Sequence, residues 1–499
     1  MIIANIGSKI YKHPESLEEY FQLFRPNIIG NNQYFDSPFG KKRILYADWT
    51  ASGRLYRPIE QKITEVFGPF MANTHTESNT TSLKMTSMYK EAKKIIKKHV
   101  SADENDVVLL EGFGMTAAIN KLQRILGIRV NERFKNVILI SKNDRPVVFI
   151  THMEHHSNHT SWLETIADVV VLQPDKNGLV DVNQLDELIH QYQDRPLKIG
   201  SFTACSNVTG IQPPYHQLAK VMHRHGGICF VDFAASAPYV KINMHPEDPL
   251  EKLDGIFFSP HKFLGGPGAS GVLVFDSRLY SNHVPDHPGG GTVMWTNPWG
   301  GRRYYSDIEL REDGGTPGIL QAIRIALCLN LKKQMGIEKM MERESELVHL
   351  LLSELEQVPT VNILDGHVKE RLGIISFYVE DIHYNLIVRL LNDRYGFQVR
   401  GGCSCAGTYG HYLYQIDQET SKHITNLIDQ EDLTEKPGWV RFSLHPTMTN
   451  EEVYLFVWAM KEIVANIDDW KKDYVYDAKS NDFFYINHIR EDFAPLFRL

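Results

Sequence analysis

The sequence predicts an α/β protein with a large, mostly parallel sheet domain followed by a smaller α+β domain at the C-terminal end. Short apolar runs alternate with amphipathic stretches through the middle of the chain, which is typical of strands and helices in a parallel sheet. Long helical periodicity begins near residue 317 and strand-like segments follow it. At 499 residues the chain is too long to fold around a single hydrophobic core, so more than one domain is expected.

The strands of the large sheet are predicted where apolar runs stand between polar or turn residues. These runs are residues 107–110, 147–150, 169–172, 199–202, 228–231, 253–258 and 271–275. Amphipathic helices are predicted at residues 182–193 and 215–225, so that helices cover the sheet. Functional residues of such sheets gather after the carboxyl ends of the strands.

We expect the chain to divide into four parts. Residues 1–45 form an N-terminal segment packing on the small domain, residues 46–335 the large domain, residues 336–469 the small domain and residues 470–499 a C-terminal extension. In the small domain, strands are predicted at 373–379 and 439–444 around a helix at 385–395. Residues 470–499 show no clear hydrophobic periodicity of a helix or a strand.

Composition narrows the function classes. A formal net charge of −8 argues against nucleic acid as the main partner, because binding the phosphate backbone needs a concentrated basic surface. No apolar run is long enough for a signal peptide or a membrane span, so no membrane partner and a cytoplasmic location are expected. Five cysteines are too few for a secreted disulfide framework.

A lysine follows the strand at 253–258 and precedes a glycine-rich turn. Lys262 at this position could hold a cofactor at the sheet edge as a Schiff base, while Ser259 and His261 could donate hydrogen bonds to a phosphate. A surface lysine before a turn is the alternative interpretation.

Asp232 ends the very apolar run at 228–231, where a carboxylate is costly without a cationic partner. A protonated pyridine nitrogen is such a partner, and the pairing keeps a cofactor ring electron-poor. A helix-capping aspartate is the alternative.

The turn around Gly114 follows the strand at 107–110 and precedes a helix. Glycines let the backbone approach an anion, and a helix N-terminus supplies free N–H groups, so Gly114, Met115 and Thr116 are expected to bind phosphate. Many strand-to-helix turns look alike without binding a ligand.

Residues 151–159 are dense in histidine. One imidazole could lie flat against a cofactor ring. A metal site is a second interpretation, and its candidate ligands are His152, His155, His156 and His159 together with Cys403 and Cys405. A loop gives these histidines no fixed ligand geometry, so no metal is expected and satisfied core histidines are the alternative.

Together, in their order along residues 46–466, these motifs resemble the cysteine desulfurase and selenocysteine lyase family. That family belongs to the class V aminotransferases, which have the aspartate aminotransferase-like fold of enzymes dependent on pyridoxal 5'-phosphate. The resemblance implies that Lys262 carries the cofactor and that Asp232 pairs with its ring nitrogen. It further implies cofactor contacts from Gly114, Met115, Thr116, His155, Asn207, Ser259 and His261, with His155 stacking on the ring. The turn at Thr316 is similar to one that reaches the partner subunit's phosphate, which implies a homodimer with shared active sites.

The resemblance also implies the substrate site. Arg441 is similar to the arginine that binds the substrate carboxylate, and Arg400, Asn73 and His75 are placed beside the substrate. Cys405 aligns with the catalytic cysteine on a glycine-containing loop.

Two residues depart from the family pattern. Ala235 stands where the family often has a cofactor-contacting glutamine, and Cys403 is a second thiol that could act in place of Cys405 or in a relay with it.

The activity implied is conversion of L-cysteine to L-alanine with a persulfide left on the enzyme. Selenocysteine is a second substrate, and a sulfur-acceptor protein is the expected partner besides the small amino acid. Another class V reaction (aminotransferase, epimerase or kynureninase-like lyase) and a sulfur-relay or scaffold protein that binds the cofactor without turnover stay open as alternatives.

Overall fold

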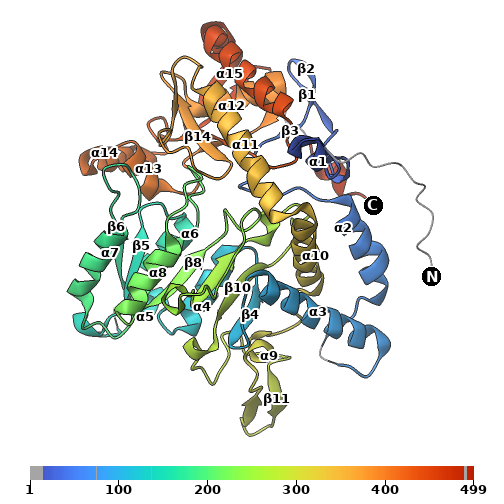
Figure 1. Cartoon of the computed structure of the whole chain (residues 1–499), viewed down its shortest axis with the longest axis vertical. Coiled ribbons are helices and arrows are strands. Elements are labelled where there is room, and N and C mark those ends of the chain that lie inside the picture. The colour runs from blue at the N-terminus through green and yellow to red at the C-terminus, as the bar shows by residue number, and fades with distance from the viewer. Residues whose placement is uncertain (1–14, 75, 136, 488–491) are drawn as a thin grey trace.

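The computed structural model describes residues 15–74, 76–135, 137–487 and 492–499. Within them, seven strands form the large sheet in the order β4-β10-β9-β8-β7-β5-β6 (Figure 1). They are β4 (Asp106–Glu111), β5 (Val147–Thr151), β6 (Asp168–Leu172), β7 (Lys198–Thr203), β8 (Ile228–Asp232), β9 (Gly255–Phe258) and β10 (Gly271–Asp276). Strands β9, β8, β7, β5 and β6 are parallel, and β10 is antiparallel to both of its neighbours. The predicted strands and the mostly parallel sheet are confirmed.

Helices cover both faces of this sheet because successive side chains of each strand point to opposite faces. Val147 and Phe149 pack in the core that contains side chains of α7 and α8, whereas Val148 and Ile150 pack with α4 and α6. The helices of the domain are α2 (Arg57–Gln61), α3 (Thr80–His99), α4 (Met115–Ile125), α5 (Glu132–Lys135), α6 (His156–Leu163), α7 (Val182–Ile189), α8 (Tyr215–Arg224), α9 (Ile308–Glu312) and α10 (Ile319–Met335). The helices predicted at 182–193 and 215–225 are thus present, the first ending in a short 3-10 turn, η5 (His190–Tyr192).

The second domain contains a four-stranded antiparallel sheet in the order β13-β14-β17-β16. Its strands are β13 (Val361–Ile363), β14 (Ile374–Val379), β16 (Arg400–Gly402) and β17 (Trp439–Ser443). Its helices are α11 (Ile337–Leu355), α12 (Tyr384–Leu390), which continues as the π-helix η9 (Leu391–Tyr395), α13 (Gly407–Leu413), α14 (Gln418–Asp429) and α15 (Asn450–Trp470). Strands β14 and β17 and helix α12 match the predicted elements.

Both ends of the described chain contact this second domain. In the N-terminal part, which contains α1 (Leu17–Gln22), β1 (Tyr34–Ser37) and β2 (Gly40–Arg43), Arg25 donates to Glu452 on α15 at 2.9 Å. Strand β3 (Leu45–Tyr46) pairs in parallel with β15 (Phe397–Gln398). The C-terminal extension, for which the sequence indicated no period, forms a hairpin of β18 (Tyr474–Asp477) and β19 (Asp482–Tyr485) that Arg389 of α12 joins through Asp482 at 2.7 Å. The numerical domain boundaries stay predictions.

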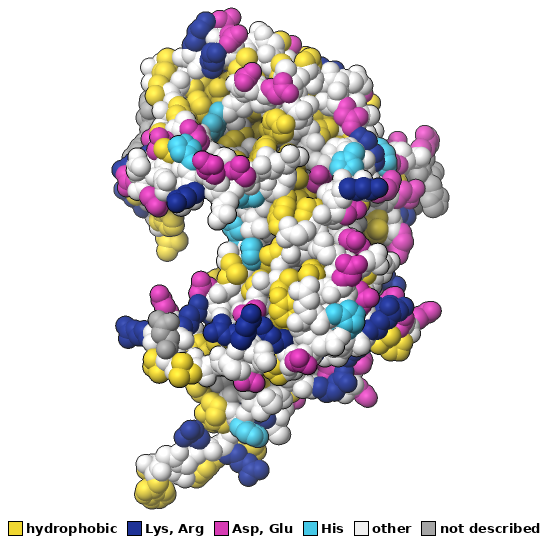
Figure 2. Space-filling model, turned by 90° about the vertical axis from the view of Figure 1, so that its left-hand side faces the viewer, with side chains coloured by type: hydrophobic (Ala, Val, Ile, Leu, Met, Phe, Trp, Pro, Cys, Tyr) yellow, Lys and Arg dark blue, Asp and Glu magenta, His cyan; other side chains and the backbone are white. Residues whose placement is uncertain are grey.

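A second hairpin, β11 (Val293–Thr296) and β12 (Arg302–Tyr304), projects from the end of the large domain farthest from the small domain (Figure 1). Its Trp295 and the turn residue Trp299 are 67% and 89% exposed. Figure 2 shows hydrophobic side chains at this lower end of the molecule. Among the described residues, the helices do not meet the length and apolarity that crossing a membrane requires.

Candidate active site

A cavity of about 230 Å³ lies where the carboxyl ends of the parallel strands face the small domain. Most of the residues expected at the site line this cavity. They are Gly114, Met115, Thr116, His155, Asn207, Asp232, Ser259, His261, Lys262, Arg400, Cys405 and Arg441. Residues of both domains therefore meet at one place, as the strand-end argument predicted for the large domain.

The two other described residues expected at the site lie elsewhere. Asn73 and Thr316 are absent from the lining of the cavity, but they contact each other, with the Asn73 amide donating to Thr316 Oγ1 at 3.2 Å. His75 lies outside the described residues. The expected roles of these three residues stay predictions.

Asp232 ends β8 and is 3% exposed. Its Oδ1 accepts a hydrogen bond from the Ala234 N–H at 2.8 Å. Burial raises the pKa of Asp232 to about 6, and both this hydrogen bond and the charge of Lys262 oppose the rise. The group is still a carboxylate at neutral pH, so it can pair with a buried cation.

Lys262 ends a short 3-10 turn, residues Pro260–Lys262, directly after β9. Burial lowers the pKa of Lys262 to about 8, and the charge of Asp232 works against that shift. A substantial fraction of this amine is therefore neutral near pH 8. A neutral amine is the form that attacks a carbonyl carbon.

The turn before α4 is shaped for close approach of an anion. Gly114 has φ +76°, and a side chain there would come within 2.9 Å of His261 Cε1 and 3.1 Å of Ser259 Oγ. The Met115 N–H at the start of α4 donates to Ser259 Oγ at 2.9 Å, which leaves the Ser259 hydroxyl proton free to point into the cavity. Backbone, hydroxyl and imidazole groups thus surround one small space at a helix N-terminus.

His155 is the N-cap residue of α6. Its Nδ1 accepts a hydrogen bond from the Ser157 N–H at 3.1 Å, so the ring proton is on Nε2. Burial and the charge of Lys262 lower the pKa of His155 to about 3, and the ring is therefore neutral. A neutral imidazole fixed by its backbone contact is suited to stacking on an aromatic ligand.

Asp48 is a functional candidate that the sequence argument missed. It accepts from Arg441 at 2.9 Å and from Arg400 at 2.9 Å, so one carboxylate joins the two arginines of the cavity. Asp48 follows the short apolar strand β3, which is the same signal that identified Asp232. Arg441 is 3% exposed, whereas the Arg400 side chain is 46% exposed.

The Cys405 loop, residues 403–407, is held by hydrogen bonds from the large domain. Ser404 and Cys405 have left-handed φ values of 51° and 59°, an unfavourable conformation for residues other than glycine. The His156 N–H donates to Cys405 O at 2.8 Å, and His156 Nε2 accepts from the Gly407 N–H at 2.8 Å. The Asn207 amide donates to Ser404 O at 2.7 Å. These contacts hold an exposed thiol over the cavity.

The histidines of residues 151–159 have separate contacts. His152 bonds to Gly178 O at 3.0 Å and His159 bonds to Thr408 Oγ1 at 3.0 Å, in addition to the roles of His155 and His156 described above. Among the described residues, the groups of side chains close enough to share a metal ion do not include these histidines. Their arrangement therefore gives the alternative of a metal site here no support. Cys403 packs partly against the core beside Trp439.

The cavity presents polar atoms that have no hydrogen-bond partner within the described part of the chain. These buried atoms are Thr50 Oγ1, Asn207 Oδ1, Ser404 Oγ and Arg441 Nε. Buried polar groups are costly unless they are paired, so they indicate a polar ligand. A phosphate at the Gly114 turn, a ring nitrogen at Asp232 and a carbonyl carbon at Lys262 match the residues present. The cavity therefore fits pyridoxal phosphate.

Curated proteins similar to this chain are named probable cysteine desulfurases. A probable cysteine desulfurase of Halalkalibacterium halodurans is 26% identical over 371 residues, 73% of this chain and 84% of that protein. One of Staphylococcus epidermidis is 27% identical over 383 residues, 76% of this chain and 87% of that protein.

Solved structures confirm the predicted fold. The apo structure of a cysteine desulfurase from Thermococcus onnurineus NA1 has a TM-score of 0.68 at 23% identity, covering 85% of this chain and 95% of that one. The Escherichia coli cysteine desulfurase CsdA, in an S-sulfonic acid form, has a TM-score of 0.69 at 21% identity, covering 89% and 98%. The family model described as Aminotransferase class-V matches residues 45–456. The chain therefore belongs to the aminotransferase class-V family of pyridoxal-phosphate enzymes.

Proposed function

We propose that the protein is a cysteine desulfurase that converts L-cysteine to L-alanine and leaves the sulfur as a persulfide on Cys405. One observation carries the proposal: an exposed thiol lines the same cavity as the buried pair Asp232 and Lys262. Aminotransferase and epimerase reactions need the buried pair but no thiol. The similarity to proteins named probable cysteine desulfurases supports the choice.

The residues of the large domain would hold pyridoxal phosphate. Lys262 would bind its aldehyde carbon, Asp232 its ring nitrogen, His155 its ring face, and the Gly114 turn with Ser259 and His261 its phosphate. When bound, this cofactor withdraws electrons from the substrate's Cα and so weakens the bonds around it. The Asp232 carboxylate would stabilise a proton on the ring nitrogen and so keep the ring electron-poor.

The arginines would orient the substrate. A guanidinium can grip a carboxylate with two parallel hydrogen bonds, and Arg441 Nε is a buried donor without a partner in the described chain. Asp48 holds Arg441 in place from the other side at 2.9 Å. Arg400, which shares Asp48, lies at the exposed end of the cavity and would contribute less.

Lys262 and Cys405 would move the proton and the sulfur. The neutral amine of Lys262, whose pKa burial lowers to about 8, accepts the Cα proton. The Cys405 thiolate attacks the substrate sulfur, a sulfur–sulfur bond forms, and the carbon–sulfur bond breaks with its electron pair left on carbon. Protonation of that carbon, followed by return of the proton from Lys262 to Cα, completes alanine. One cysteine and one enzyme thiol thus become one alanine and one enzyme persulfide.

A homodimer and a sulfur acceptor complete the proposal. Asn73 and Thr316 contact each other outside the cavity of their own chain, which suits a role in a partner's site. The exposed Trp295 and Trp299 of the projecting hairpin suit burial against a second subunit. The exposed thiol of Cys405 suits transfer of sulfur to an acceptor protein, and the five free cysteines suit a reducing compartment such as the cytoplasm.

The test is product analysis with L-cysteine and a reductant. We expect alanine and sulfide in equal amounts, and we expect borohydride to fix the cofactor to the peptide that contains Lys262, as seen by mass spectrometry. An exchanged amino group or a racemised substrate without sulfide would assign the protein to another class V reaction. A yellow protein inert towards cysteine would favour the relay or scaffold alternative.

A further inference from the structure

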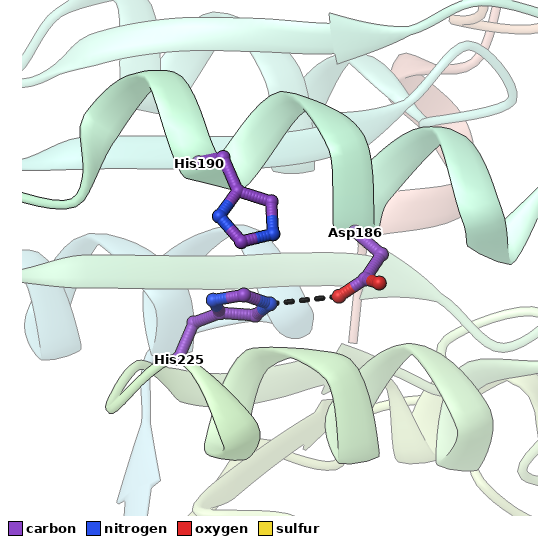
Figure 3. A group of neighbouring side chains, drawn as sticks. All are labelled: Asp186, His190 and His225. Atoms are coloured by element: carbon purple, nitrogen blue, oxygen red, sulfur yellow. Dashed lines mark hydrogen bonds and ion pairs between the residues drawn. The ribbon is translucent and has the colours of Figure 1, made fainter.

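Three potential metal ligands converge on the outer surface of the large domain, away from the cavity. Asp186 lies on α7 and His190 follows in η5, four residues later and on the same helical face (Figure 3). His225 is the C-cap residue of the neighbouring helix α8. Leu185 and Ile189 on α7 and Leu218 and Met222 on α8 are buried, so packing of the two helices fixes where the three side chains meet.

The donor atoms are close to coordination geometry. The possible ligand atoms all lie within 4.8 Å of one another, and His225 Nε2 lies 2.7 Å from Asp186 Oδ1. Ligands of a tetrahedral zinc ion lie about 2.0–2.2 Å from the metal, which places them about 3.3–3.6 Å apart. An ion in place of the proton shared by Asp186 and His225 would need only small side-chain rotations.

Each side chain is already in a suitable state for coordination. Asp186 Oδ1 accepts from His225 Nε2 at 2.7 Å, so this carboxylate oxygen and this ring nitrogen already face each other. His190 Nδ1 contacts the Gln193 side chain at 2.5 Å, which leaves Nε2 for a metal. Histidine ligands in metal sites are commonly oriented through their other ring nitrogen in this way. The two imidazole rings pack edge to face, with centroids 4.7 Å apart.

We propose that Asp186, His190 and His225 bind one divalent transition-metal ion of the zinc type. Two imidazole nitrogens and one carboxylate oxygen are a donor set typical of zinc, and the fourth position would be filled by water. The bound ion would join the end of α7 to the end of α8 on the surface. This metal site is independent of the proposed desulfurase activity, because none of its three residues lines the active-site cavity.

The test is equilibrium dialysis of the holoenzyme against Zn²⁺, with metal and protein measured together. Both loop thiols are changed first, as Cys403→Ala and Cys405→Ala, so that zinc bound by cysteine is not counted. We expect one ion per chain at this site and a higher melting temperature with zinc. His225→Gln and His190→Gln should each weaken zinc binding by at least about tenfold. Changing a residue that only hydrogen-bonds to a metal ligand already costs about tenfold in affinity, and these variants remove a ligand itself.

Two control variants make the result specific. His423→Gln removes an exposed histidine that pairs with Glu435 at 3.2 Å without belonging to a described three-ligand group, and it should leave zinc binding unchanged. His245→Gln alters the other candidate group, formed with Asp103 and Asp106, and should also leave the binding unchanged. Spectra of Co²⁺ bound in place of zinc should show a four-coordinate site without a thiolate charge-transfer band.

Three outcomes would overturn the proposal. They are the absence of stoichiometric zinc binding, equal binding by the His190 and His225 variants, and loss of the ion only in His245→Gln. The first would leave Asp186 and His225 as a hydrogen-bonded pair that joins two helices without a metal.

Discussion

The two ends of the active-site cavity differ in how the chain holds its reactive groups. Asp232 is the last residue of β8 and Lys262 ends the short turn after β9, and burial shifts the pKa values of both groups towards neutrality. Cys405 is an exposed residue on a loop with left-handed backbone, and hydrogen bonds from other residues hold that loop. Acid–base chemistry benefits from a rigid, buried place, whereas a group that must hand sulfur to another molecule needs access to solvent.

The largest expected effect separates these two ends. Cys405→Ala should lower sulfide release from L-cysteine by more than about 10³-fold, as removal of a nucleophile does in other enzymes with covalent intermediates. The absorbance of bound pyridoxal phosphate should be unchanged, because the residues around it are intact. Activity and absorbance are measured on the same sample.

Cys403→Ala is the matched control, since this thiol is on the same loop but packs partly against the core. Its effect should be small. If Cys403→Ala loses sulfide release and Cys405→Ala keeps it, the two thiols have been assigned the wrong way round. If neither variant loses it, the persulfide mechanism is wrong.

The next prediction compares two arginines that pair with Asp48, the buried Arg441 and the more exposed Arg400. Arg441→Ala should raise the KM for L-cysteine by about 30-fold or more, since truncating one partner of a buried charge pair costs about 2–5 kcal/mol. Arg400→Ala should raise it by less than about fivefold, because exposed ion pairs contribute about 1 kcal/mol or less. Steady-state kinetics at fixed pH measures both, and equal effects would show that burial does not decide which arginine binds the substrate.

The sequence alone predicted the buried end of the cavity better than the loop end. Asp232 and Lys262 each follow an apolar strand, and this local pattern places them at the carboxyl edge of a parallel sheet whatever the rest of the chain does. The contacts of Asp48 with two arginines and of His156 with Gly407 join residues far apart in the sequence. The hydrophobic periodicity of a short stretch of sequence cannot predict such contacts, because they depend on how the two domains pack.

The same limit applies outside the cavity. Asp186 and His190 share a helical face by their spacing, but His225 reaches them only through the packing of α7 on α8. The hairpin of β18 and β19 was missed because its residues alternate weakly and its position depends on contacts such as Arg389 with Asp482. Resemblance to a family did not help there, since that resemblance ended before the extension.

A smaller effect tests how the loop is held. His156→Ala should slow persulfide formation by about fivefold, since it removes one side-chain hydrogen bond worth about 1 kcal/mol and leaves the backbone bond to Cys405 in place. Burial lowers the pKa of His156, so its Nε2 is an acceptor at neutral pH. His156→Gln, whose amide oxygen can also accept, should recover part of the rate. Single-turnover labelling of the persulfide measures the step, and a change in cofactor absorbance would instead indicate a general disturbance.

The smallest effect is a shift in pH that tests the coupling of Asp232 to Lys262. Only the neutral amine can bond to the cofactor's aldehyde, so covalent attachment to cofactor-free enzyme should speed up through about pH 8 and then level off. With a lysine of ordinary pKa, the rate of attachment would continue to rise above pH 10. Asp232 has a pKa of about 6 and is ionised throughout this range, where its negative charge favours the ammonium form.

Removing the charge of Asp232 should therefore lower the pH at the midpoint of the attachment-rate profile. Asp232→Asn is expected to lower it by less than about one pH unit, because burial, the larger cause of the lowered pKa, is unchanged. The rate of attachment is followed by the cofactor's absorbance from pH 6.5 upwards, with the ionic strength held constant. A midpoint that rises in Asp232→Asn would mean that this carboxylate does not face the Lys262 amine, and the buried end of the cavity would lose the electrostatic pairing that distinguishes it from the loop.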